Sequence, residues 1–263
     1  MILCVQTYTI RRLMQENLET ALKKLLDFPV KSIELARIKF NDKNIELVKK
    51  SGLNVVSMQV KFSQLRKNFQ SYVSWCKLLN CEILVVSVLP LSGIIGGKAM
   101  LSSFTKKLNR LAQAFHDAGI TLAFHHHDFE FKKISKITKF EYIVRHTTGK
   151  VKFVVDTYWV TKTNNDPVAI IRWLDDRLIG LHLRDHQSIK KGRKQIVTDC
   201  EIGSGTIDFE KVYAAAKKYA IYGAIEQNTL TPLESLQKSV DFLKAKRLES
   251  TPNLRSSIWN RTK

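Results

Sequence analysis

Residues 121–131, TLAFHHHDFEF, hold the densest group of metal-binding and proton-transferring side chains in this sequence. An apolar run leads into three consecutive histidines, an aspartate, and Glu130 between two phenylalanines. Strand side chains alternate, so His125 and His127 are expected on one face and His126 on the other. Structural histidines at a strand end are the alternative, but three adjacent imidazoles with two acids favour metal or proton chemistry.

The composition is that of a globular protein with a substantial core. The 263 residues are 44% hydrophobic and 25% charged, a length typical of a single α/β barrel. The four cysteines show no CxxC or zinc-finger spacing, which predicts a reduced, cytoplasmic protein. The first ten residues do not resemble a secretory signal, and no run reaches the ~18 apolar residues of a membrane span.

The formal charge of +19 is the unusual feature of the composition. Such a charge is compatible with nucleic acid or anionic substrates, but it says nothing about the fold. Most basic residues alternate with apolar ones at helical spacing, so we interpret them as solvated helix faces. We therefore expect a small-molecule partner and neither a membrane nor a nucleic acid; whether the chain forms a homo-oligomer is left open.

Apolar, β-branched runs alternate eight times with amphipathic helical stretches. The predicted strands are residues 2–9, 32–37, 54–60, 82–89, 121–127, 151–159, 178–185 and 223–227. The predicted helices are residues 13–28, 42–51, 63–79, 100–118, 135–146, 166–176, 208–220 and 232–246. Eight such rounds, with no glycine-rich dinucleotide fingerprint after the first strand, predict a closed (β/α)8 TIM barrel. We expect one domain over residues 1–246 and a basic tail, docked or disordered, over residues 247–263.

Chemistry-bearing residues stand at the ends of the last four predicted strands. In such a barrel the active site lies where the strands end. Glu130, Asp156, His182 and Glu226 each follow an apolar run there. Singly, each has a structural interpretation as a cap, a core histidine or an ion-pair partner. Together they form a mixed oxygen and nitrogen ligand set suited to Mn²⁺, Mg²⁺, Co²⁺ or Zn²⁺.

Five motifs occur in a recognisable order. They are HHHDFEF at 125–131, DTYWV at 156–160, HLRD at 182–185, GSGTIDF at 203–209 and EQN at 226–228. With this ordered set the chain resembles the sugar phosphate isomerase/epimerase family, within the xylose isomerase-like TIM barrel superfamily. The resemblance extends from residue 5 to about residue 244.

The resemblance implies one divalent ion held by Glu130, Asp156, His182 and Glu226. His125 or His127 could replace Glu130, because the family varies at its strand-five acid. The two glutamates are then the catalytic residues that shuttle a proton beside a metal-polarised carbonyl.

Other residues at the strand ends are candidates for substrate binding. For Arg184, an ion pair with Asp185 is the alternative role. The basic segment 187–195 is interpreted as a solvated loop in preference to a phosphate site. The substrate-binding candidates are His125, His127, Arg184, Tyr158, Trp159, Gln6 and Tyr8.

The chain departs from the resembled family at several positions. It has His126 where asparagine is usual, Gln59 where a histidine is usual, Ser204 for glutamate, Asn228 for aspartate and Arg184 for lysine. These departures leave the keto-sugar or polyol substrate, and its phosphorylation, open. The alternatives are a metal-dependent dehydratase of an inosose-type substrate, a non-catalytic sugar-binding barrel, and an endonuclease IV-like DNA repair enzyme. The last is disfavoured by Gln59.

Overall fold

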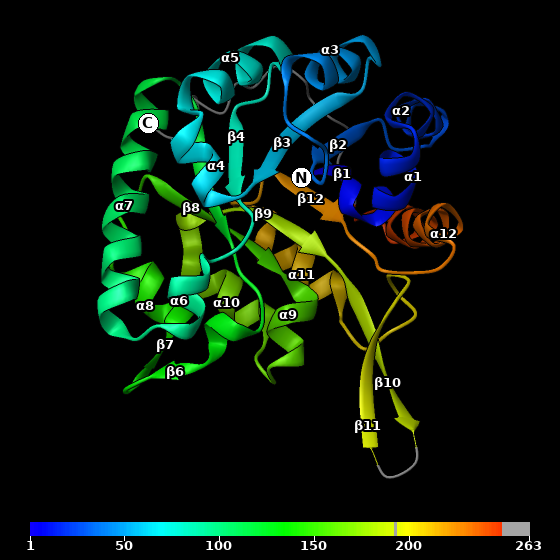
Figure 1. Ribbon diagram of the computed structural model, residues 1–263. Helices are drawn as coiled ribbons and strands as arrows, with labels where there is room; N and C mark the ends of the chain where they lie inside the picture. The colour runs from blue at the N-terminus through cyan, green and yellow to red at the C-terminus, as the bar shows by residue number, and fades with distance from the viewer. Residues whose placement is uncertain (192–193, 249–263) are drawn as a thin grey trace.

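The computed structural model describes residues 1–191 and 194–248 of the chain. Eight parallel strands close into a barrel in the order β1-β12-β9-β8-β5-β4-β3-β2, with helices outside it (Figure 1). The strands are β1 Ile2–Gln6, β2 Ser32–Leu35, β3 Asn54–Val60, β4 Ile83–Val86, β5 Thr121–His125, β8 Val151–Asp156, β9 Leu178–Leu183 and β12 Tyr222–Ile225. The predicted (β/α)8 TIM barrel is confirmed.

Amphipathic helices cover the outside of the barrel. Along α7 the buried residues Leu101, Phe104, Leu108, Leu111 and Phe115 recur every three or four positions, so one face packs on the sheet. The helices are α1 Arg11–Glu16, α2 Leu18–Asp27, α3 Asp42–Lys50, α4 Phe62–Lys67, α5 Phe69–Leu79, α6 Leu91–Ile95, α7 Lys98–Asp117, α8 Lys139–Arg145, α9 Thr157–Lys162, α10 Pro167–Leu174, α11 Phe209–Ala216 and α12 Pro232–Ala245. Three 3₁₀ turns accompany them: η1 Thr7–Ile10, η2 Phe129–Phe131 and η3 Asp175–Arg177.

Several predicted boundaries were wrong, and local hydrogen bonding explains two of them. The strand predicted over 151–159 ends at Asp156, because the Asp156 carboxylate accepts a hydrogen bond from Trp159 N and starts α9. The helix predicted over 13–28 is two helices, because Asn17 caps the second through Thr20 N. The helix predicted over 63–79 is also two, α4 and α5.

Segments between the main elements also differ from the predictions. The predicted loop after β4 contains α6, and the helix predicted from residue 135 begins at 139, after the short pair β6 Lys133–Ile134 and β7 Ile137–Thr138. The segment predicted as a loop after β9 is an antiparallel hairpin, β10 Asp185–Lys191 and β11 Lys194–Cys200. This hairpin projects from the barrel (Figure 1). The predicted tail lies outside the described residues beyond Leu248, and its boundary at 246 stays a prediction.

A buried lysine holds α6 against α8. Lys139 is 6% exposed, and its Nζ donates to the carbonyl oxygens of Gly93 at 3.0 Å, Gly96 at 3.4 Å and Ile94. These carbonyls lie at the C-terminal end of α6, where a cation is favourable.

Replacing Lys139 with Met is expected to lower the free energy of unfolding by about 2 kcal/mol, because carbonyl oxygens lose their donor in a buried place. Urea unfolding followed by circular dichroism measures the change. The exposed Lys136→Met variant is the control and should stay within about 0.5 kcal/mol of the parent. Equal stability of the two variants would contradict this role.

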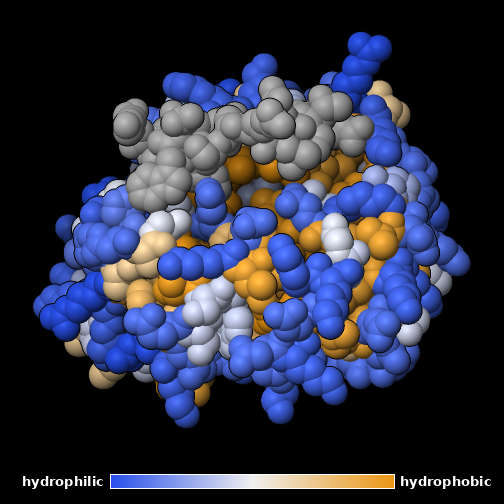
Figure 2. Space-filling view, turned by 90° about the horizontal axis from the view of Figure 1, so that it is seen from above, coloured by the Kyte–Doolittle hydropathy of each residue, from blue (hydrophilic) through white to orange (hydrophobic). Residues whose placement is uncertain are grey.

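One end of the barrel is rich in hydrophilic side chains. β3 and β4 run downward in Figure 1, so the view from above in Figure 2 looks on the end where these strands begin. Hydrophilic side chains stand over much of that face. Within residues 1–191 and 194–248, no helix has the length and apolarity to cross a membrane.

Candidate active site

Four buried side chains meet where β5, β8, β9 and β12 end. His125, Asp156, His182 and Glu226 each offer one ligand atom, and these atoms lie within 4.8 Å of one another. His182 Nδ1 is 2.9 Å from Glu226 Oε2 and 3.8 Å from Asp156 Oδ2, and His125 Nε2 is 3.5 Å from Asp156 Oδ2. We call this group the four-residue cluster. It assembles because parallel register pairs Asp156 with His182 on adjacent strands.

The donor set of the four-residue cluster fits a divalent metal. In the described part of the chain, both ring nitrogens of His125 lack a hydrogen-bond partner although they are buried, and its Nε2 faces the Asp156 carboxylate. Burial, together with the neighbouring His182, lowers the pKa of His125 to about 3, so its imidazole is neutral and its lone pair is available. His182 would offer a second nitrogen once its Nδ1 proton is released on metal binding. Two imidazole nitrogens and two carboxylates are a ligand set typical of Zn²⁺, Mn²⁺ or Co²⁺.

A buried carboxylate that contacts His182 was not predicted from the sequence. Glu34, in the middle of β2, is fully buried and accepts hydrogen bonds from Ser57 Oγ and Tyr222 Oη at 2.6 Å each. Its other carboxylate oxygen lies 2.6 Å from His182 Nε2. A carboxylate on the far nitrogen fixes the tautomer and orientation of a metal-binding histidine. Glu34 therefore turns His182 Nδ1 toward the four-residue cluster.

The charges around His182 and Glu226 favour the ionised forms. Burial alone would lower the pKa of His182, but Glu34 and Glu226 outweigh it and raise this pKa to about 10. Burial likewise opposes ionisation of Glu226, yet the Arg184 guanidinium and His182 hold the pKa of Glu226 well below its usual range. Glu226 is thus a carboxylate throughout the neutral pH range.

Arg184 joins the cluster to the projecting hairpin. Its Nη1 lies 3.0 Å from Glu226 Oε1 and 3.4 Å from Asp156 Oδ2, while Nη2 is 2.9 Å from Asp199 Oδ2 on β11. The alternative pairing with Asp185 was wrong. The Asp185 carboxylate instead accepts hydrogen bonds from the backbone of the GSGTIDF segment, namely Gly203, Gly205 and Ile207 N–H groups.

Glu130, expected as a metal ligand and a catalytic residue, lies outside the four-residue cluster, where His125 stands in its place. β5 ends at His125, and the η2 turn carries Glu130 away to accept a hydrogen bond from His127 N at 2.8 Å. Burial raises the pKa of Glu130 to about 8, so its carboxyl is mostly protonated at neutral pH. His126 points outward, as predicted, and packs on Phe140.

Replacing Glu130 with Gln is expected to change how stability depends on pH. The folded-state pKa is about 8 against 4.5 for the ordinary carboxyl, so Glu130 lowers the stability of the parent progressively as pH rises from 4.5 to 8. The Gln variant lacks this loss, so its stability relative to the parent should increase over that window by about 3 to 5 kcal/mol. Urea unfolding at pH 5, 6, 7 and 8 tests it; a constant difference would contradict it.

A cavity of about 770 Å³ opens above the four-residue cluster. Glu226 and His125 line it, with Asp199 and polar side chains from the ends of β1 and β3. Six of the seven predicted substrate-binding residues line this cavity: His125, His127, Tyr158, Trp159, Arg184 and Tyr8. Gln6 is fully buried and does not line the cavity: its Nε2 donates to Gln59 Oε1, and its Oε1 accepts from Tyr8 N.

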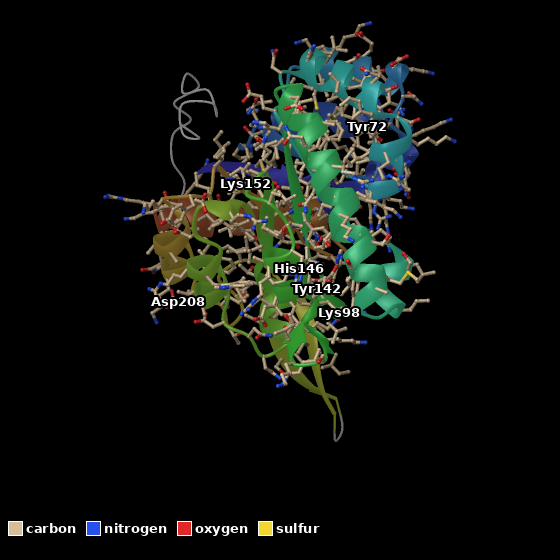
Figure 3. All side chains as sticks on the ribbon, turned by 90° about the vertical axis from the view of Figure 1, so that its left-hand side faces the viewer. Tyr72, Lys98, Tyr142, His146, Lys152 and Asp208 are labelled. Atoms are coloured by element: carbon tan, nitrogen blue, oxygen red, sulfur yellow. The ribbon has the colours of Figure 1, made fainter. Side chains whose placement is uncertain are left out.

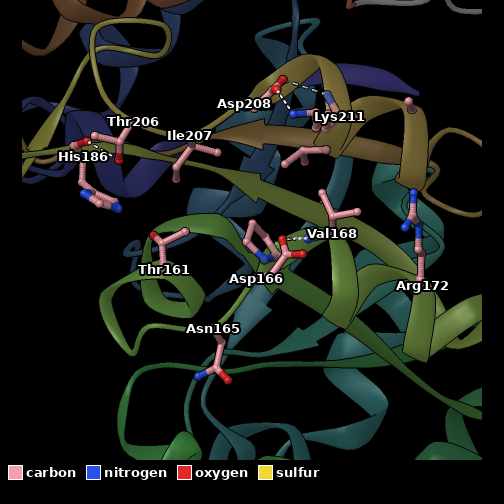
Figure 4. A pocket seen from close by; sticks show the side chains of 13 residues that line it. Thr161, Asn165, Asp166, Val168, Arg172, His186, Thr206, Ile207, Asp208 and Lys211 are labelled. Carbon is pink, nitrogen blue, oxygen red and sulfur yellow. Dashed lines mark hydrogen bonds and ion pairs between the residues drawn. The ribbon is translucent and has the colours of Figure 1, made fainter.

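A second cavity of about 700 Å³ lies outside the barrel, between α9, α10 and α11 (Figure 4). Its two acids have structural roles. Asp166 caps α10 through Val168 N, and Asp208 caps α11 through Lys211 N and also pairs with Lys211 Nζ. We therefore do not assign chemistry to it.

His146 on α8 is a structural histidine. Its ring stacks on Tyr142 with centroids 3.8 Å apart, and its Nδ1 bonds the Tyr142 carbonyl oxygen (Figure 3). The stack lies on an outer helix, away from the four-residue cluster.

Comparison with known proteins agrees with this architecture. Residues 26–246 match the family model described as xylose isomerase-like TIM barrel. The chain belongs to this family. The family and its structural neighbours are mostly enzymes, among them proteins named sugar phosphate isomerase/epimerase, D-tagatose 3-epimerase-like protein and probable 3-DHS dehydratase. A search of curated protein sequences gives no significant match.

Solved structures share the fold at low sequence identity. A sugar phosphate isomerase/epimerase from Parabacteroides distasonis is 20% identical with a TM-score of 0.73, over 94% of this chain and 97% of that one. The IolI protein, solved with a zinc atom, is 16% identical with a TM-score of 0.65, over 95% and 100%. The probable 3-DHS dehydratase AsbF from Bacillus anthracis is 9% identical with a TM-score of 0.70, over 93% and 99%.

Proposed function

We propose that this protein is a divalent-metal-dependent isomerase that transfers a proton at the carbon next to the carbonyl of a keto-sugar or related polyol. One observation carries the proposal: the buried four-residue cluster opens into a cavity large enough for such a substrate. His125, Asp156, His182 and Glu226 would hold the metal, which when bound polarises the carbonyl as a Lewis acid.

Glu226 is the residue we propose as the base. It is ionised at neutral pH and so can accept a proton, its side chain reaches the cavity, and Arg184 holds one of its oxygens in place. The other carboxylate lining the cavity, Asp199, is paired with two nitrogens of Arg184. Glu130 lies away from the cluster. The family resemblance implied two glutamates that shuttle the proton. We therefore propose that one carboxylate, Glu226, does so here.

A single base returns the proton to the face from which it took it. That geometry suits isomerisation between an aldose and a ketose, whereas inversion at one carbon needs a second group on the opposite face. Elimination of water begins with the same proton abstraction, so a dehydratase is the second candidate. AsbF, named a probable dehydratase, has the same fold.

Aromatic and cationic side chains would bind the substrate. The Arg184 guanidinium stacks 4.6 Å from the Tyr158 ring and 5.2 Å from the Trp159 ring, which fixes all three. His127 packs on Trp159 at 5.4 Å, and its Nδ1 has no partner in the described residues. These groups offer an apolar wall for sugar C–H groups and hydrogen bonds for hydroxyls.

Elemental analysis of the purified protein, followed by a solvent deuterium exchange screen over ketoses and inososes, tests the proposal. Metal-dependent deuterium at the carbon beside the carbonyl supports it, and loss of water from the substrate selects the dehydratase. A protein that neither contains nor binds a divalent metal would refute both. Steeply salt-dependent DNA binding would favour the nucleic-acid alternative.

A further inference from the structure

A side groove of about 540 Å³ adjoins the catalytic cavity. Lys61, after β3, and Val88, after β4, line both spaces and form the boundary between them. The side groove runs between α4 on one side and α6 with the start of α7 on the other. A ligand bound above the four-residue cluster therefore has a route outward over these two side chains.

The side groove differs chemically from the catalytic cavity. Its floor contains the buried side chains Phe62, Leu89 and Phe104, with the two phenyl rings 5.1 Å apart. Ile94 and the half-exposed Met100 also line it. The charged residues that line the side groove are all cations, whereas the catalytic cavity has carboxylates and imidazoles beside its cations.

We propose that the substrate carries an apolar substituent, aryl or alkyl, that lies in the side groove while its polyol part reaches the four-residue cluster. The proposal rests on the proposed function for the position of the polyol part. Continuity with the catalytic cavity identifies the occupant, because a groove that shares lining residues with the site is reached by the same ligand. Burial of a phenyl ring on this floor should increase affinity about tenfold or more.

The Met100 methyl group gives a local readout of the side groove. In protein labelled with ¹³C at its methionine methyls, phenyl β-D-glucopyranoside is expected to shift the Met100 resonance, and methyl β-D-glucopyranoside is not. Met14, which is 5% exposed in the core, is the internal control and should not move. The phenyl glycoside should also bind at least about tenfold more tightly by NMR titration.

A matched pair of variants on α7 separates the groove from nonspecific binding. Ser103 lines the side groove, so Ser103→Trp fills it and should remove the preference for the phenyl glycoside. Lys106 is exposed on the same helix outside the groove lining, so Lys106→Trp should keep the preference. Equal affinity for the two glycosides in the parent, including no detectable binding of either, overturns the proposal, as does a preference that survives in Ser103→Trp.

A different occupant of the side groove and a failure of the proposed function would give different results. A Met100 resonance that moves with protein concentration in the absence of glycoside would assign the side groove to a second copy of the chain and overturn the proposal. Failure of the proposed function would appear as absent metal binding, which leaves the Met100 shift unchanged. The two inferences are therefore tested separately.

Discussion

Replacing Glu226 with Gln is expected to lower the metal-dependent deuterium exchange rate by about 10³-fold or more. The amide keeps the size of the side chain and can still accept a hydrogen bond from Arg184, but it cannot take a proton. The loss should remain when metal is saturating, because it concerns the base and not only the metal ligand. Exchange rates measured over a metal titration separate the two effects.

Glu130→Gln is the matched control for this prediction. The Glu130 carboxyl is buried, mostly protonated at neutral pH, and outside the cluster, so the isosteric amide should leave exchange within about threefold of the parent. The reverse result, with exchange lost in Glu130→Gln and kept in Glu226→Gln, would restore Glu130 as the proton carrier and refute the single-base proposal.

The barrel was predictable from the sequence because its strands are buried on both faces. Runs such as residues 83–86, ILVV, lack the alternation of a half-exposed strand, and parallel strands of this kind need intervening helices. The ends of the strands were less predictable. Residues 157–159 are aromatic or β-branched and favour a strand, but the Asp156 cap starts a helix there.

The four-residue cluster was predictable in part. His182 in β9 and Arg184, directly after that strand, both contact the Glu226 carboxylate, as their spacing of two residues indicated. The choice between His125 and Glu130 depended on where β5 ends, and element boundaries are the least certain part of a sequence interpretation. Since β5 ends at His125, the next turn removes Glu130 from the cluster.

The contact between Glu34 and His182 could not be predicted from the sequence pattern. The signal was present, because an acid inside a fully buried four-residue strand needs partners to offset its desolvation. Its partner His182 is 148 residues away, however, and only closure of the barrel brings β2 opposite β9. Ser57 and Tyr222, from two further strands, complete the set.

Glu34→Gln is expected to weaken binding of Zn²⁺ or Mn²⁺ about 10- to 100-fold. The parent carboxylate accepts from Ser57 and Tyr222 on one oxygen and from His182 Nε2 on the other. A Gln amide has one oxygen, so its nitrogen faces either the two hydroxyls or the imidazole. In the second case it donates to Nε2 and moves the His182 proton to Nδ1, where it blocks the ligand lone pair.

Tyr222→Phe is the control that separates this effect from a general loss of core packing. It removes one donor to the same carboxylate without touching His182, so it should cost about 1 to 2 kcal/mol of stability but change metal affinity less than about threefold. Calorimetric titration gives the affinities, and urea unfolding of the metal-free proteins gives the stabilities. If both variants lost stability and Glu34→Gln bound metal as tightly as the parent, Glu34 would be a core residue with no influence on His182. A fall in metal affinity in Glu34→Gln, with little change in Tyr222→Phe, is the result expected if the Glu34 carboxylate sets the tautomer of His182.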